Sequence, residues 1–163
     1  PQMASILNVD QIKNAAGTSA MTIDSSGRIT TPARPAFVAY PTNSGNTQSA
    51  TSVLPYSIAL LNVGNCYNTS TYKFTAPVTG LYFVAFSVWT GSSTTTRCAF
   101  YVNNAKHGDS VYGIGTRTDA NSNQNDSAQT VMSLTASDVV DIRVYAGGVN
   151  IFGTNFFMGY LLG

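Results

Sequence analysis

The chain has 163 residues and a mass of 17.2 kDa, which is enough for one domain with a substantial core and a shorter appendage. Charged residues make up only 9% of it and the formal net charge is +1, so no basic stripe supports nucleic-acid binding. The apolar runs are too short to cross a bilayer, and the N-terminal stretch lacks the apolar core of a signal peptide. We expect neither a nucleic-acid partner nor membrane insertion.

The composition favours strands over helices. Glu, a strong helix former, is absent, and Lys occurs only at positions 13, 73 and 106. The chain has Tyr 9 times and Phe 8 times and is rich in Val and Thr, all of which fit a pleated, half-buried surface. The sequence therefore predicts an all-β fold.

Residues 1–33 contain two short strand-like pieces, 6–10 and 21–24, separated by turn residues around Gly17 and before Arg28. Pieces this short bury too little surface alone, so we expect them to lie against another chain or another copy. A disordered tail is the alternative. The two prolines in 31–35 predict a stiff joint, which divides the chain into an arm, residues 1–33, and a head, residues 34–163.

Beyond this joint, strand signals alternate with turn residues, as in a β-sandwich. The predicted strands are 37–40, 56–62, 73–74, 81–89, 97–102, 127–134, 139–145 and 155–162. Both faces of 81–89 are apolar, with Tyr82 and Phe86 on one and Phe83 and Trp89 on the other. A chain too small for three layers could cover the second face with a neighbouring subunit or with its own loops.

Polar stretches at 42–51, 91–96 and 116–129 are predicted to be exposed loops that bind a partner. The candidate binding residues in them are Asn43, Asn46, Thr94, Asp119, Asn123, Asn125 and Asp126. The order of the Asp and Asn residues does not match an EF-hand loop, which needs a Gly and a closing Glu. We expect no cofactor and no metal site, with calcium as the one alternative left open.

The residues that usually perform catalysis do not cluster. Cys66 and Cys98 lack a CxxC partner and are expected to be buried free thiols, although a disulfide stays open. His107 is the only histidine, and Asp109 and Ser110 stand too close to it in sequence to converge as a triad. Paired carboxylates would have to come from scattered Asp residues. We expect a protein that is not an enzyme.

A set of aromatic and small residues recurs at specific spacings between residues 56 and 86. These positions are Tyr56, Asn62, Tyr67, Phe74, Gly80, Tyr82, Val84 and Phe86. The pattern resembles the signature of the globular head of complement C1q and its relatives, with Tyr56 in place of a Phe and Val84 in place of an aromatic residue. The endings 137–142 and 157–162 also resemble late strands of that family.

The resemblance implies a ten-stranded jelly roll similar to tumour necrosis factor, assembled as a homotrimer around an axis lined with aromatic residues. It further implies partner binding through loops and no shared catalytic residues. For the trimer interface and core, the sequence nominates apolar positions of the long strand and of the last strand: Tyr82, Phe86, Phe156, Met158 and Tyr160.

Residues 6–24 resemble the leader of structural proteins of tailed bacteriophages, especially marine and cyanobacterial ones. The two resemblances together imply a virion protein, a trimeric fibre or knob that binds a host-surface glycan or protein through loops of its head. Residues 1–33 would then bind other virion proteins. The alternatives are a capsid decoration protein that stabilises the phage head and, further off, a secreted C1q-like binding module.

Overall fold

The computed structural model describes residues 9–42, 47–91, 95–108, 113–119, 123–150 and 153–163. Two compact units make up the chain, Pro1–Arg34 and Pro35–Gly163. All regular elements in the described ranges are β-strands, in agreement with the predicted all-β fold. The described ranges likewise contain no helix that is long and apolar enough to cross a membrane.

The N-terminal unit is a small antiparallel sheet in the order β1-β2-β3, formed by Gln11–Lys13, Ser19–Ile23 and Ile29–Thr30. Asp24 closes the β2–β3 turn, because its Oδ1 accepts hydrogen bonds from the backbone N–H groups of Ser26 and Arg28. The predicted piece 21–24 overlaps β2. The predicted piece 6–10 lies largely outside the described residues, and its last two residues precede β1 instead of forming a strand.

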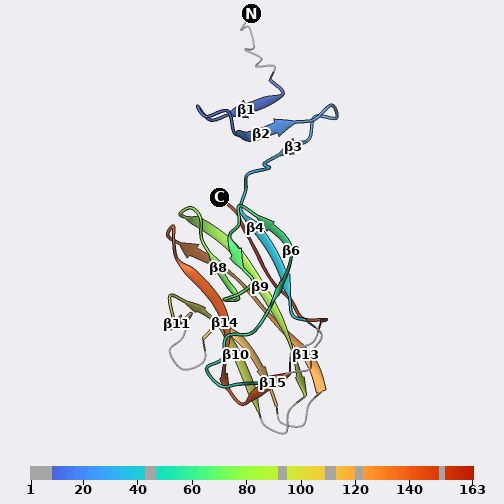
Figure 1. Cartoon of the computed structure of the whole chain (residues 1–163), viewed down its shortest axis with the longest axis vertical. Helices are drawn as coiled ribbons and strands as arrows, with labels where there is room; N and C mark the ends of the chain where they lie inside the picture. The colour runs from blue at the N-terminus through green and yellow to red at the C-terminus, as the bar shows by residue number, and fades with distance from the viewer. Residues whose placement is uncertain (1–8, 43–46, 92–94, 109–112, 120–122, 151–152) are drawn as a thin grey trace, which may run out of the picture. The chain divides into compact units, whose positions relative to one another are not determined.

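The C-terminal unit is a sandwich of two sheets (Figure 1). The larger is seven-stranded, in the order β5-β15-β9-β16-β4-β6, with β13 also paired to β9. Its long strands lie side by side, and β13 is in register with β9 along its full length, from Asn123 opposite Gly91 to Leu134 opposite Gly80. Its strands are β4 (Ala36–Tyr40), β5 (Thr47–Ser49), β6 (Ile58–Val63), β9 (Gly80–Gly91), β13 (Asn123–Leu134), β15 (Gly148–Asn150) and β16 (Phe157–Leu161).

The smaller sheet is six-stranded, in the order β11-β10-β14-β8-β7, with β12 also paired to β10. Its strands are β7 (Tyr67–Asn68), β8 (Lys73–Thr75), β10 (Thr96–Val102), β11 (Ala105–Lys106), β12 (Gly115–Thr118) and β14 (Val139–Ala146).

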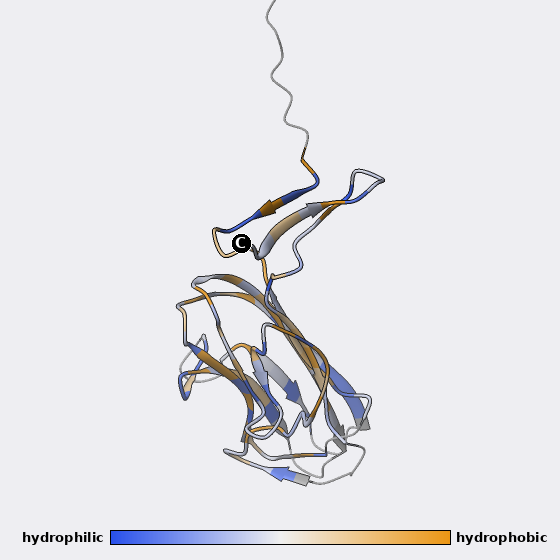
Figure 2. Ribbon diagram, turned by 45° about the horizontal axis from the view of Figure 1, so that its top comes forward, coloured by the Kyte–Doolittle hydropathy of each residue, from blue (hydrophilic) through white to orange (hydrophobic). Residues whose placement is uncertain are grey.

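An aromatic core fills the space between the two sheets. The ring of Phe37 stacks on Tyr67 and Phe74, with centroids 5.0 and 4.9 Å away, and packs edge-on against Phe157 at 4.8 Å. The buried Tyr56 hydroxyl donates to the carbonyl oxygen of Ser87 at 2.9 Å, so its polar atom is satisfied. Hydrophobic colouring along much of the long strands reflects this core (Figure 2).

Two predicted loops are wrong. β5 (Thr47–Ser49) lies within the predicted loop 42–51 and pairs with β15. The sequence predicts an exposed polar loop over 116–129, yet β12 ends at Thr118 and β13 begins at Asn123. Asn123, Asn125 and Asp126 therefore belong to a strand that is paired to β9. Backbone pairing along β9 overrides the weak strand propensity of Asn and Asp, since strand propensity depends strongly on context.

Candidate functional site

The outward side of the seven-stranded sheet carries a continuous apolar surface. Val131, Phe83 and Tyr160 form one row across β13, β9 and β16, because each lies directly opposite the next in register. The rings of Phe83 and Tyr160 are 5.4 Å apart. Directly paired residues of antiparallel strands share one face of the sheet. We call this surface the outer apolar face and define it by Val38, Leu61, Leu81, Phe83, Val131, Met158 and Tyr160.

The outer apolar face is uncharged. The strands of the seven-stranded sheet contain a single charged residue, Asp126. Asp126 belongs to the inward-facing set of β13, and its carboxylate accepts a hydrogen bond from the hydroxyl of Thr118, which lies on the other sheet. Leu81 and Val131 remain 49% and 51% exposed. A partner could therefore cover this face without desolvating any charge.

The residues nominated for the trimer interface and core fall into two groups. Tyr82 and Phe86 are fully buried inside the single chain, so they belong to its core and cannot contact another copy. Met158 and Tyr160 are half-buried on the outer apolar face, and the half-buried Phe156 directly precedes β16. The sequence places Phe83 on the second face of its strand, but Phe83 is not among the residues nominated for the interface. Its alternation with the fully buried Tyr82 and Val84 is the signal that identifies it.

The family-motif positions stabilise the fold. Asn62 holds Tyr67 through two hydrogen bonds, donating to its carbonyl oxygen at 2.9 Å and accepting from its N–H at 3.0 Å. Gly80 has no room for a side chain, because an added Cβ would lie 2.8 Å from Leu161 Cδ1. The remaining motif positions are buried core residues: Tyr56, Phe74, Tyr82, Val84 and Phe86.

The candidate loop residues do not form one site in the described parts of the chain. Asn43, Asn46 and Thr94 lie outside the described residues. Asp119 is exposed and forms an ion pair with Arg117, with an Nη2–Oδ1 distance of 2.5 Å. Asn125, on β13, accepts a hydrogen bond from Asn155, which joins two parts of the sandwich.

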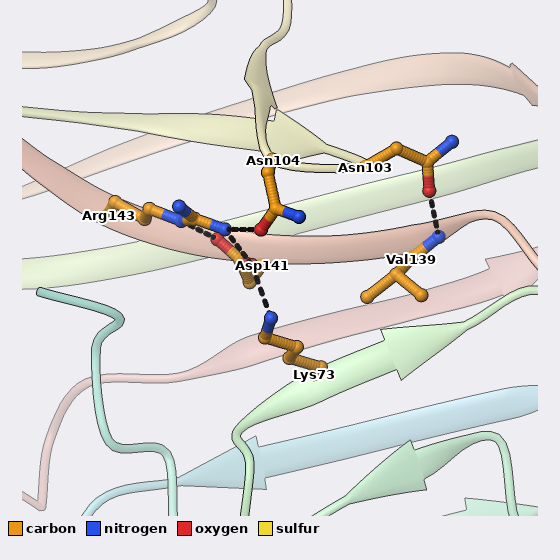
Figure 3. A network of polar contacts seen from close by, with 6 residues as sticks. All are labelled: Lys73, Asn103, Asn104, Val139, Asp141 and Arg143. Atoms are coloured by element: carbon orange, nitrogen blue, oxygen red, sulfur yellow. Dashed lines mark hydrogen bonds and ion pairs between the residues drawn. The ribbon is translucent and has the colours of Figure 1, made fainter. Parts of the chain in front are cut away.

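A polar network lies on the outward side of the six-stranded sheet (Figure 3). Asp141, only 1% exposed, accepts hydrogen bonds of 2.6 and 2.8 Å from Nε and Nη2 of Arg143, and Lys73 Nζ is 3.6 Å away. The Arg143 guanidinium also lies 4.7 Å from the ring centroid of Tyr101. The sequence does not predict this network, because Lys73 and Tyr101 lie far from Asp141 and Arg143 in the chain and the charges form no run.

Neither cysteine is set up as a nucleophile. Cys66 and Cys98 are buried free thiols. Burial raises the pKa of Cys98 from its ordinary 9.0 to about 12, so the reactive thiolate is suppressed at neutral pH. His107 is half-buried, while Asp109 and Ser110 lie outside the described residues. No group of three or more His, Cys or Asp side chains that could hold a metal occurs in the ranges that the structure describes.

Comparisons with solved structures place the head among the jelly-roll folds. The globular domain of zebrafish complement 1qA aligns with a TM-score of 0.63 and 17% identity over 80% of this chain and 98% of that one. The Eiger TNF of S. frugiperda aligns with a TM-score of 0.61 and 16% identity over 80% and 93%. Murine APRIL aligns with a TM-score of 0.57 and 11% identity over 79% and 99%. At these identities the likeness is one of fold.

The assignment to a family rests on a match of the amino-acid sequence. The C1q domain model matches residues 36–162, which is most of the chain and nearly all of the sandwich. No curated protein matches the sequence. Domains of the C1q and TNF type are generally binding modules without enzymatic activity. On the family match and the jelly-roll geometry together, the chain belongs to the C1q domain family.

Proposed function

We propose that this chain is a trimeric structural protein of a tailed-bacteriophage virion, a fibre or knob whose C1q-type head binds the host surface. The observation that carries the trimer is the outer apolar face, which spans several strands and includes no charge. Relatives of the C1q and TNF type are homotrimers, and three copies around an axis would cover three such faces at once.

The virion role rests on the N-terminal segment. Residues 6–24 resemble phage structural leaders, and the unit that contains them forms its own small sheet, separate from the head. Ile12 and Ile29 are 47% and 61% exposed there, which leaves apolar side chains for contact with another virion protein. A trimeric head would then multiply weak contacts with a repetitive host surface through avidity.

Light scattering on the full chain tests the trimer. We expect a mass three times 17.2 kDa at micromolar concentration. A monomer under those conditions would refute the trimer and the avidity argument. The truncated chain that begins at Ala33 should give a trimer too if the head alone drives assembly.

Antibody labelling of intact particles, viewed by electron microscopy, tests the place of the protein in the virion. Label on projecting fibres, with reduced adsorption to host cells when free trimers compete, supports the proposal. Label spread over the capsid shell, with no competition, would identify a decoration protein instead. Particles that carry no label would refute the virion role.

A further inference from the structure

The positive charges of the head are concentrated on one sheet. Every Lys and Arg between residues 35 and 163 lies on a strand of the six-stranded sheet, one on each of five strands. These residues are Lys73, Arg97, Lys106, Arg117 and Arg143. The acids described beside these strands are Asp119, the buried Asp141 and Asp138, which accepts a hydrogen bond from Asn103, so five cations against three acids leave this side net positive. We call it the cationic face.

Two of these guanidinium groups face each other across a strand pair. Arg97 on β10 lies directly opposite Arg117 on β12. Like charges at such positions destabilise a sheet, and an uncharged residue at either position would avoid this cost. Asp119 offsets part of it through its 2.5 Å ion pair with Arg117. An anion bound between the two guanidinium groups would relieve the rest of this cost.

A cleft of about 230 Å³ opens between these two arginines, lined by Arg97, Gly113, Gly115, Thr116, Arg117 and Tyr145. Burial raises the pKa of Tyr145, and the charge of Arg97 together with its side-chain hydrogen bond to the phenol partly opposes the rise, so the phenol stays protonated at neutral pH. Lys106 Nζ lies 4.3 Å from the centroid of the same ring. The cleft therefore combines two planar cations and one aromatic wall, and the ammonium group of Lys106 lies against that aromatic ring without lining the cleft.

This combination selects a small anionic group with an apolar side. Arginine forks match carboxylates in bidentate geometry, and an aromatic ring packs against the C–H face of a sugar ring. The volume is below the roughly 300–1,000 Å³ of pockets for drug-sized ligands, so the cleft would take a single ring-sized group. Acids interspersed among the cations disfavour a long polyphosphate, which needs an unbroken basic stripe.

We propose that the cleft between Arg97, Arg117 and Tyr145 binds a carboxylate-bearing sugar of an acidic polysaccharide on the host surface. The biological setting rests on the proposed function, whereas the binding chemistry rests on the cleft alone. The cationic face is the opposite side of the sandwich from the outer apolar face, so trimer formation would leave three such clefts open to solvent.

Calorimetric titration of the full chain with a galacturonate hexamer tests the chemistry, with the methyl-esterified hexamer as a neutral control. We expect the charged hexamer to bind at least about tenfold more tightly, because a hydrogen bond to a charged group contributes roughly 1.5–3 kcal/mol. Equal affinity for both hexamers would overturn the proposal. So would equally tight binding of a single-stranded DNA hexamer, which would indicate unspecific attraction of anions.

Two variants test the cleft, Arg97→Gln and Arg117→Gln, each expected to weaken hexamer binding at least about tenfold. Arg28→Gln is the matched control, because Arg28 also forms an exposed ion pair, 2.7 Å from Asp24, but lies in the N-terminal unit. It removes the same charge and should leave the affinity unchanged. If Arg28→Gln weakens binding as much as Arg117→Gln, the cleft is not the site.

Asp119→Asn guards against loss of binding through misfolding. It releases Arg117 from its carboxylate partner, so we expect binding of the hexamer to strengthen a few-fold. Weaker binding in this variant would contradict the assigned role of Arg117.

The cell-binding readout separates this inference from the proposed function. If wild-type trimers bind host cells and the double variant of Arg97 and Arg117 binds them equally well, the cleft proposal fails and the host-binding function stands. Suppose instead that wild-type trimers bind the hexamer, do not bind host cells and are not found on virus particles. The host-binding function then fails and the cleft proposal stands.

Discussion

Strands β9 and β14 lie on opposite sides of one core, and both alternate buried side chains with outward-facing ones. On β9 the outward positions are apolar or uncharged, as at Leu81 and Phe83. On β14 they include Asp141 and Arg143, which bond to each other. The same strand geometry thus produces one side that loses little when it is removed from water and another that favours solvent or an anionic ligand.

Introducing a charge on the outer apolar face should break this contrast most severely. For Val131→Asp we expect complete loss of the trimer, because burying an unpaired carboxylate costs several kcal/mol and each copy would bring one. Val131 is 51% exposed in the single chain, so the variant should still fold. Light scattering with a thermal melt measures both properties.

The matched control is Thr75→Asp, which adds the same carboxylate at an exposed position on the six-stranded sheet. This variant should remain a trimer. A Val131→Asp protein that stays trimeric at the same concentration would show that assembly uses a different surface.

High pH should lower the unfolding free energy of the head, because the buried thiol of Cys98 lies in the core between the two faces. Burial raises the pKa of Cys98 from 9.0 to about 12. The unfolded thiol ionises from about pH 9 while the folded thiol stays protonated, so stability is full below pH 9 and falls as the pH rises toward 12. The difference between the unfolded and the folded pKa of Cys98 corresponds to a loss of about 4 kcal/mol of unfolding free energy. Urea unfolding at several alkaline pH values measures the slope, which should be flatter for Cys98→Ala; identical slopes would assign the loss to other groups.

Removing the buried acid of the cationic face should have a smaller effect. For Asp141→Asn we expect a loss of about 2 kcal/mol of unfolding free energy, because Arg143 and Lys73 lose a charged acceptor. Asp119→Asn, at an exposed ion pair, should change stability by less than about 1 kcal/mol. Urea unfolding at neutral pH compares the two. Equal losses of unfolding free energy in the two variants would mean that the burial of Asp141 does not strengthen its ion pairs.

High salt should have the smallest effect of these changes, and it should weaken binding at the cationic face while leaving assembly through the outer apolar face unchanged. Between about 0.1 and 1 M NaCl the Debye length falls from about 10 to 3 Å, so binding of the galacturonate hexamer should weaken several-fold. The trimer mass should not change, because the outer apolar face has no charge to screen. Dissociation of the trimer at high salt would indicate an assembly interface that depends on ion pairs.

The sequence predicted the long strands well, because their alternation is strong. The predicted strand 81–89 lies within β9 and the predicted 139–145 within β14. Strands as short as β7 and β11 cannot show any period. The polar start of β13 was misread as a loop, since the pairing that orders it comes from β9, which is distant in the chain.

The site was predicted only in part. The two apolar sides of residues 81–89 indicated an external cover, but alternation alone does not say which side faces the core, so Tyr82 and Phe86 were nominated alongside the outward residues. The cationic face was invisible as a pattern, because its charges are spread one to a strand. Only the sheet order brings Arg97 opposite Arg117.

The family motif lies inside the sandwich, and this location has an evolutionary consequence. Asn62, Tyr67 and Gly80 hold the backbone in place through hydrogen bonds and close packing. Outward positions such as 97, 117 and 145 can therefore vary while the motif is retained. A library randomised at positions 97, 117 and 145 would therefore vary the proposed ligand specificity and leave the outer apolar face, and with it the proposed trimer, unchanged.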